Sequence, residues 1–230
     1  IKPKTKLLVV DSIASLSGFV FPPTEIVGAA HDRGVPVLVD AAHAPGQIDV
    51  NLEAMNADFW VGNMHKWICS PRAAAYLHVA EQWRDQVRPL VASHGYAGGF
   101  HEAFDWTGTF DPVNVLAIPA ALDFWESQGG WDEVRRRQRE TVDDGAKRVA
   151  AALDSHSPIQ AQVRSSMRIS ELPVALTADA ARELEAALAA RQIEISLMPL
   201  HDKSWVRVCG QIYNTTEDYD RLGAALRDLV

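Results

Sequence analysis

The chain has 230 residues, 47% hydrophobic and 23% charged, which is ordinary composition for a globular protein that buries a sizeable core. A formal net charge of −8 argues against a surface that binds nucleic acid. The 2 cysteines are too few for a disulfide framework and lack the spacing of a metal site, and no run approaches the roughly 18 apolar residues of a membrane span.

The opening stretch, "IKPKTKLLVV", has neither the long apolar segment nor the small-residue cleavage site of a signal peptide. We therefore expect a cytoplasmic protein. The chain lacks a starting methionine and enters a strand almost at once, so we also expect it to begin inside a longer protein.

The first half of the chain alternates apolar strands with helices. Residues 6–10 and 35–40 are continuous apolar runs, a pattern typical of strands buried on both faces. The stretch between them, 22–34, predicts a helix with Thr24 as its N-cap. A strand, a helix and a strand at this spacing predict a right-handed βαβ unit in a mainly parallel sheet. Three further elements follow, a short helix at 51–57 and strands at 58–62 and 73–79.

The signal weakens between residues 80 and 120. The glycine-rich, aromatic stretch at 92–112 predicts an irregular loop with a functional purpose. A long helix follows, because apolar residues recur near one face with charges elsewhere. The residues of that face are Trp131, Val134, Val142, Val149 and Leu153.

After about residue 155, short alternating elements predict a small α+β domain. Its last helix spans 215–230, with Thr215 and Asp218 in the spacing of a capping box. The elements expected before it are strands at 163–176, 192–197 and 204–213 and a helix at 178–191. We divide the chain into part of a large α/β domain at 1–125, a connecting long helix at 126–155, and the small domain at 156–230.

Two ionisable residues follow consecutive strands of the predicted sheet. Asp40 ends one strand, and Lys66 comes a few residues after the next. Ligands of open α/β sheets bind beyond the carboxyl ends of the strands. An acid that ends a strand is more often a simple turn former, but both residues together, flanked by His43 and His65, indicate a site.

The chemistry that uses a carboxylate and an amine in this way is pyridoxal phosphate catalysis. A lysine forms a Schiff base with the aldehyde carbon of the cofactor, and a carboxylate keeps the pyridinium nitrogen protonated. Lys66 and Asp40 are the candidates for these two catalytic roles. His43 can lie near the ring or its phenolic oxygen, while Asn63 and His65 are placed to bind the phosphate.

The stretches "DAAHAPG" at 40–46 and "GNMHKW" at 62–67 carry a resemblance to a known family. The sequence resembles the class V (fold type I) aminotransferases, in their isopenicillin N epimerase-like branch. The likeness extends to "WTGTFDP" at 106–112 and "VRVCGQIYNTTEDYDRL" at 206–222, and it covers essentially the whole chain. It implies pyridoxal 5'-phosphate as cofactor and a fold type I PLP-dependent transferase-like α/β fold whose mainly parallel sheet is N-terminally incomplete.

The resemblance also implies roles for three further residues. Thr109 matches a residue that reaches the cofactor phosphate of the neighbouring subunit, which implies a homodimer; its alternative role is to stabilise a glycine turn. Arg207 matches the arginine that holds the substrate carboxylate, although it could be a surface arginine. Ser15 matches a position close to the cofactor.

Most members of this family remove the Cα proton of an amino-acid substrate, with the displaced lysine as the natural base. Epimerisation, C–S lysis and transamination then remain open. A cysteine desulfurase is disfavoured, because the stretch 194–207 contains no nucleophilic cysteine. We interpret Cys69, Cys209 and Trp67 as packing residues. The other histidines are interpreted as solvated or packed, namely His31, His78, His94, His101, His156 and His201.

In this family the N-terminal part supplies a phosphate-binding helix and the ring that stacks on the pyridine. The present chain starts after both. The rival hypothesis is therefore a truncated, non-enzymatic chain that keeps the fold but cannot hold the cofactor alone.

Overall fold

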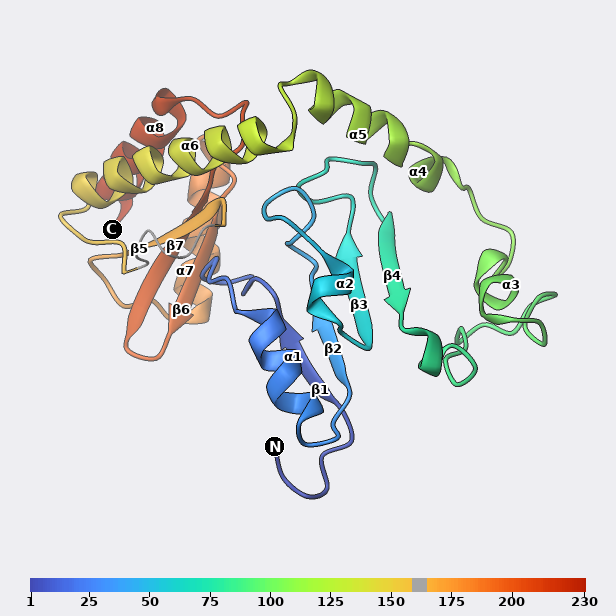
Figure 1. The fold of residues 1–230 in the computed structure, drawn as a ribbon. Helices are drawn as coiled ribbons and strands as arrows, with labels where there is room; N and C mark the ends of the chain where they lie inside the picture. Colours follow the sequence, from blue (N-terminus) through green and yellow to red (C-terminus); the bar gives the residue numbers. More distant parts are fainter. Residues whose placement is uncertain (159–164) are drawn as a thin grey trace. The chain divides into compact units, whose positions relative to one another are not determined.

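The computed structural model describes residues 1–158 and 165–230. The chain forms two compact units (Figure 1). The first unit consists of Ile1–Ser12 and Phe21–Phe124, and the second of Ile13–Val20 and Trp125–Val230. No helix in the described part of the chain is long and apolar enough to cross a membrane.

The first unit is built on a four-stranded sheet in the order β1-β2-β3-β4. Its strands are β1 (Leu8–Asp11), β2 (Val37–Asp40), β3 (Phe59–Asn63) and β4 (Ala75–Val79). The first three run parallel, and β4 is antiparallel to β3. The prediction of a mainly parallel sheet is thus confirmed. The central strand β2 fills the core because Val37 and Val39 are fully buried, as its unbroken apolar run requires.

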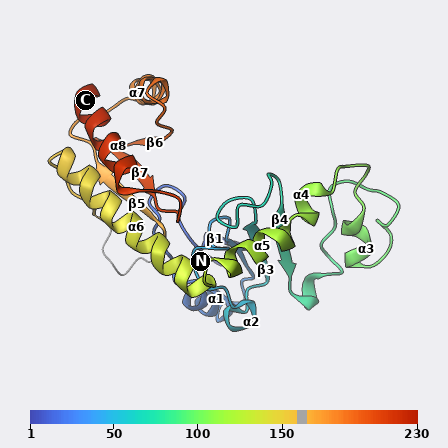
Figure 2. The ribbon, with the colours of Figure 1, turned by 90° about the horizontal axis from the view of Figure 1, so that it is seen from above.

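Two helices pack on one face of this sheet, α1 (Pro23–His31) and α2 (Leu52–Met55) (Figures 1 and 2). Helix α1 buries Val27 and Ala30, which lie one turn apart. The expected cap was wrong: the N-cap is Pro22 and makes no side-chain hydrogen bond, so Thr24 lies inside the first turn. Proline at the first helical position needs no hydrogen-bond acceptor, which explains the earlier start.

The remainder of the first unit contains four helices joined by loops and turns. They are η1 (Glu81–Trp83), α3 (Phe100–Asp105), α4 (Val113–Leu116) and α5 (Ile118–Ser127), the last of which extends into the second unit. Helix α3 corrects the prediction that 92–112 is irregular throughout. Its first turn is capped because the Glu102 carboxylate accepts the N–H of Gly99 at 2.8 Å.

The second unit packs helices against a three-stranded antiparallel sheet in the order β5-β7-β6. Its elements are α6 (Trp131–Ala152), β5 (Met167–Glu171), α7 (Ala178–Ala190), β6 (Ser196–Leu200), β7 (Lys203–Cys209) and α8 (Thr216–Leu229). Helices α6 and α8 run side by side (Figure 2). Val142, Val149 and Leu226 are buried in the core beneath them. The predicted capping box is confirmed, since the N–H of Thr215 donates to Asp218 at 2.9 Å.

All three strands of the second unit have boundaries that differ from expectation. Strand β6 starts at Ser196 rather than 192, because Gln192 is left-handed and the chain still hydrogen-bonds to the end of α7 there. It continues through Pro199, which an edge strand tolerates. Strands β5 and β7 are shorter than predicted. Residues 163–164 of the first expected strand lie outside the described residues.

Asp58, just before β3, is a buried hub that the sequence analysis did not identify. One carboxylate oxygen accepts the N–H of Val37 and the Nε2–H of His31, both at 2.8 Å. The other accepts the indole N–H of Trp83 at 2.7 Å. Burial raises the pKa of this carboxyl, but the hydrogen bonds it accepts outweigh burial and hold the pKa below its usual value. Through these hydrogen bonds, Asp58 links α1, β2 and η1 to the start of β3.

Replacing Asp58 by asparagine should lower the free energy of unfolding by about 2–3 kcal/mol near neutral pH. The reason is that hydrogen bonds to a charged acceptor are lost and an amide N–H faces existing donors. Because the folded pKa is lowered, this stabilisation is present above the unfolded pKa of about 4 and is lost as the pH falls through the folded value. Urea denaturation near pH 7 and near pH 3 measures both effects.

The exposed Asp32 at the end of α1 provides the matched control. Asp32→Asn should leave stability nearly unchanged at either pH. Equal losses in the two variants would contradict the role of Asp58 as a hub.

Candidate active site

The candidate residues of the first unit gather where β2 and β3 end. Asp40 is the last residue of β2, and Asn63 is the last of β3. Parallel pairing of these strands, with Asp40 opposite Val61, brings their carboxyl ends to one sheet edge. The Asp40 side chain is exposed, and its Oδ1 accepts the N–H of Ala42 at 3.0 Å. The carboxylate is thus oriented by its own turn.

The two loops that follow β2 and β3 meet through His43 and Lys66. The amine Nζ of Lys66 lies 3.2 Å from Nε2 of His43. The other ring nitrogen of His43, Nδ1, accepts the indole N–H of Trp67 at 3.3 Å. The half-buried Lys66, which follows β3, therefore faces an imidazole whose other ring nitrogen is held by a hydrogen bond from Trp67.

Close backbone packing holds the same two loops together. Gly46 has φ +86°, and a Cβ there would lie 3.0 Å from the carbonyl carbon of Trp67. Trp67 itself is buried, as expected of a packing residue. On the other side of the turn, the buried amide of Gln47 donates to the carbonyl of His43 at 2.8 Å. These contacts constrain the backbone at His43 and at Trp67.

Gly46→Ala should lower the free energy of unfolding by at least about 1–2 kcal/mol, the cost of a left-handed conformation for a residue with a Cβ. The contact with Trp67 should add to that cost, because backbone cannot move aside cheaply. Urea denaturation measures the effect. Gly28→Ala in α1 is the control, since a Cβ there meets nothing within 4 Å and alanine favours a helix. A Gly46 variant as stable as the Gly28 variant would contradict the packing.

The loop 64–74 between β3 and β4 contains Lys66 and is called the lysine loop below. His65, next to Lys66, is hydrogen-bonded to the last residue of this loop. Its Nδ1 donates to the carbonyl of Ala74 at 3.0 Å, because a carbonyl oxygen can only accept. The other nitrogen, Nε2, can then donate only if the ring is an imidazolium. Asn63 is half-buried at the end of β3 and pairs through its backbone with Ala75.

The lysine loop carries backbone strain. Cys69 and Ala73 have φ +58° and +72°, a left-handed conformation that is uncommon for residues other than glycine. Such positions concentrate at functional sites. The interpretation of Cys69 as a packing residue was wrong, because it is exposed on this turn. Its thiol lies 3.5 Å from the carbonyl oxygen of Lys66.

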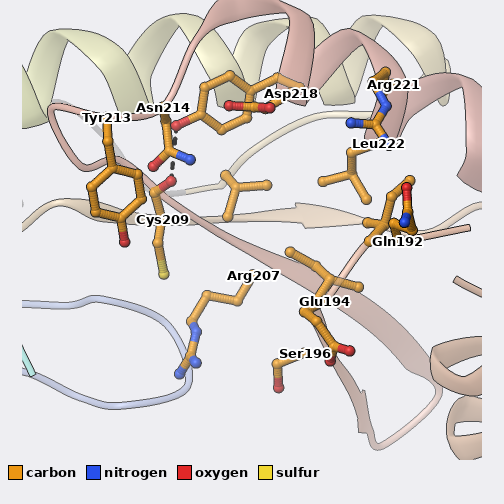
Figure 3. Close-up of a pocket in the computed structure, with 14 residues that line it drawn as sticks. Gln192, Glu194, Ser196, Arg207, Cys209, Tyr213, Asn214, Asp218, Arg221 and Leu222 are labelled. Atoms are coloured by element: carbon orange, nitrogen blue, oxygen red, sulfur yellow. Dashed lines mark hydrogen bonds between the residues drawn. The ribbon is translucent and has the colours of Figure 1, made fainter. Parts of the chain in front are cut away.

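Arg207 and Ser15 belong to the second unit. The Arg207 guanidinium donates through Nη1 to the carbonyl of Ser15, and its Nε is buried with no hydrogen-bond partner among the described residues. Arg207 also lines a cavity of about 580 Å³ beside β7 (Figure 3). The guanidinium thus retains donor capacity for a ligand group.

Cys209 extends from β7 to the same side as Arg207 (Figure 3), as residues two apart in a strand do. Burial raises the pKa of its thiol, and the neighbouring arginine only partly offsets the rise. A thiol of raised pKa is a poor nucleophile. This agrees with its interpretation as a packing residue.

Thr109 lies on the segment between α3 and α4, and its side chain is exposed. Trp106, Phe110 and Val113 around it expose 46%, 49% and 59% of their surface. The segment therefore presents an apolar surface to which Thr109 belongs.

The structure brings His43, Lys66 and Trp67 into contact and places Asp40 and Asn63 at the same sheet edge. Arg207 and Ser15 contact each other in the other unit. The sequence analysis missed the hydrogen bonds of Trp67 and Gln47 to His43. The glycine at the end of "DAAHAPG" was the available signal that this loop packs closely on a neighbour.

Comparison with known proteins identifies a family for this chain. The model of the family described as aminotransferase class-V matches residues 1–222. The chain is 32% identical to putative L-cysteine desulfhydrase 1 of Oryza sativa subsp. japonica, over 99% of this chain and 52% of that protein. It is 30% identical to isopenicillin N epimerase of Amycolatopsis lactamdurans, over 99% of this chain and 61% of that protein. The chain thus spans about half the length of the first of these curated relatives.

Solved structures share the fold at lower identity. The apo cysteine desulfurase of Thermococcus onnurineus NA1 superposes with a TM-score of 0.79 at 20% identity, over 98% of this chain and 60% of that one. The cystine C–S lyase C-DES, in complex with cysteine persulfide, superposes with a TM-score of 0.80 at 19% identity, over 100% of this chain and 62% of that one. These neighbours support an α/β architecture for the whole chain.

Proposed function

The chain belongs to the aminotransferase class-V family, and from that membership we propose that it carries a pyridoxal 5'-phosphate-dependent activity on a small amino-acid substrate. The observation that carries the proposal is the contact between Lys66 Nζ and His43 Nε2. It lies at the sheet edge where Asp40 ends the neighbouring strand.

The residues present fit this cofactor by their donor chemistry. An amine, an imidazole and a carboxylate follow adjacent strand ends, and the carboxylate is exposed with one oxygen oriented by its own turn. In the second unit, Arg207 has a buried Nε that has no hydrogen-bond partner among the described residues. When bound, the cofactor supplies an aldehyde carbon that an amine can attack and a ring that accepts the electrons left at Cα.

Each residue then has a chemical task. Lys66 would attach the cofactor through Nζ and, as the free amine, would take the Cα proton. Asp40 would hold a proton on the pyridine nitrogen, and His43 would donate to the phenolic oxygen. Arg207 would hold the substrate carboxylate, which a guanidinium can bind with two parallel hydrogen bonds.

His65 and Asn63 are proposed to bind the phosphate. With Nδ1 committed to the carbonyl of Ala74, His65 donates to phosphate only as the imidazolium. Phosphate would favour that charged form.

For the outcome of the reaction we propose epimerisation at Cα, as in the branch that the two internal stretches resemble. The named isopenicillin N epimerase relative supports this proposal. C–S lysis is the second candidate, favoured by the relative named as a putative L-cysteine desulfhydrase. Transamination remains the third.

Cα-proton exchange tests the proposal and separates these outcomes. The protein with added cofactor is incubated in deuterated solvent with a panel of amino acids, and deuterium at Cα is followed by NMR. Exchange with inversion supports epimerisation. Release of sulfide and pyruvate from L-cysteine supports lysis, whereas absence of exchange with every amino acid would reject the proposed class of reaction.

The non-enzymatic alternative makes a different prediction. A chain that keeps the fold without holding the cofactor would develop no visible absorbance band on addition of pyridoxal 5'-phosphate. A saturable band, absent when Lys66 is replaced, would exclude this alternative.

We further propose a cytoplasmic homodimer in which Thr109 reaches the cofactor phosphate of the neighbouring subunit. The support is its exposure within the apolar segment that includes Trp106 and Phe110. Light scattering after size exclusion should give twice the chain mass of 25.3 kDa. A monomer that retains full Cα exchange would contradict the role of Thr109.

A further inference from the structure

Each ring nitrogen of His43 has a nitrogen atom of another side chain within hydrogen-bond distance. Its Nδ1 is 3.3 Å from the indole nitrogen of Trp67, and its Nε2 is 3.2 Å from Nζ of Lys66. An indole nitrogen is a donor only. Nδ1 must therefore accept, and the proton of a neutral imidazole then resides on Nε2.

This arrangement has a consequence for the lysine. With Nε2 protonated, the short contact to Lys66 is a hydrogen bond only if Nζ accepts. An ammonium group has three donors and no acceptor, whereas a neutral amine has a lone pair. If the ring were an imidazolium, Nδ1 would also carry a hydrogen, and this N–H would face the indole N–H of Trp67 with no acceptor between them. The Nε2–H tautomer of a neutral imidazole therefore favours the neutral amine of Lys66, the nucleophilic form of lysine, over the ammonium.

The surroundings keep the indole in place. Trp67 is only 8% exposed, and its backbone packs on Gly46 with no room for a Cβ between them. The amide of Gln47 fixes the backbone of His43. The indole N–H of Trp67 is thus positioned to donate to Nδ1 of His43.

We propose that Trp67 is a positioning residue whose indole N–H holds His43 as the Nε2–H tautomer, so that a donor rather than an acceptor faces Lys66 and favours its neutral, reactive amine over the ammonium. This inference rests on the proposed function in that Lys66 is the residue that attaches the cofactor. The tautomer itself is a property of the chain without cofactor.

The tautomer is measured directly by NMR. The cofactor-free protein, labelled with ¹⁵N-histidine, gives separate Nδ1 and Nε2 shifts in long-range ¹⁵N–¹H spectra at a pH where His43 is neutral. The parent should show the Nε2–H form. Trp67→Phe should change the tautomer ratio about 2- to 10-fold toward Nδ1–H, the loss expected for one hydrogen bond.

Trp60 offers a matched control for this substitution. It is 2% exposed on β3, and its indole nitrogen has no hydrogen-bond partner in the part of the chain that the structure describes. Trp60→Phe should therefore leave the tautomer of His43 unchanged. If Trp67→Phe does not fold, benzothienylalanine at position 67 keeps the shape of the indole and removes only its N–H.

Reactivity of the amine gives a second readout. Competitive acetylation followed by mass spectrometry compares Lys66 with the exposed Lys147 in the same sample. Loss of the Trp67 donor should slow labelling of Lys66 about 2- to 10-fold relative to Lys147. An Nδ1–H tautomer in the parent, or variants of Trp67 with unchanged tautomer and labelling, would overturn the proposal. Failure of the proposed function would instead appear as absent cofactor attachment with these two measurements unaltered.

Discussion

We expect replacing Lys66 by alanine to reduce the rate of Cα-proton exchange by about 10³- to 10⁴-fold, because the substitution removes the base of the reaction. It also removes the amine that attaches the cofactor. The imidazole of His43, now without its partner at 3.2 Å, cannot replace the amine as a nucleophile toward an aldehyde. Deuterium incorporation at Cα, followed by NMR, measures the loss.

Two controls separate lost chemistry from lost structure. Lys147→Ala removes an exposed lysine from α6 and should leave exchange unchanged. A small primary amine added to the Lys66→Ala variant should restore part of the rate, since it can act as a base in the space left by the side chain. Full exchange in the Lys66 variant would refute the assigned role of the lysine.

Asp40→Ala should leave cofactor attachment to Lys66 intact but reduce Cα exchange by about 10²- to 10³-fold, the range seen when one preorganised electrostatic partner is removed. Without a carboxylate, the pyridine nitrogen loses its proton and the ring accepts electrons poorly. The comparison of the absorbance band with the exchange rate separates binding from chemistry.

Asp11 is the matched control for Asp40. It ends β1 at the same sheet edge, directly opposite Asp40 in the register of the two strands, and it too is exposed. Asp11→Ala should therefore change the exchange rate far less. Equal losses in the two variants would show that the charge of this sheet edge, rather than Asp40 itself, supports the reaction.

The elements that the sequence predicted well are those whose burial is uniform along the segment. Val37 and Val39 lie in an unbroken apolar run and occupy the core of the central strand. The stripe of α6, including Val142 and Val149, is buried at helical spacing. In both cases the periodicity of burial is itself the signal.

The misplaced boundaries depend on single backbone conformations. Gln192 adopts φ +60° and delays β6, while Pro22 and Pro23 displaced the expected cap at Thr24. Gly99 and Glu102 start α3 inside a stretch that its glycines predict as irregular. The composition of a segment does not determine the backbone conformation of a single residue, so the sequence could not predict these boundaries.

The sequence was enough to predict which residues of the candidate site lie at strand ends. It was not enough to predict the hydrogen bonds between their side chains. Asp40 and Lys66 were found because parallel strands bring their carboxyl ends together. The hydrogen bond from Trp67 to His43 depends on side-chain orientation in two loops, which no periodicity encodes. Asp58 was overlooked because its partners, His31 and Trp83, are distant in sequence and have no shared motif.

Reduction with borohydride after addition of pyridoxal 5'-phosphate tests the central claim most directly. The reduced protein is digested, and mass spectrometry locates the pyridoxyl group among the lysine peptides. We expect the group on Lys66, with a yield about 2- to 10-fold lower in the Trp67→Phe variant. A pyridoxyl group absent from Lys66, or spread over exposed lysines such as Lys147, would contradict the role of Lys66.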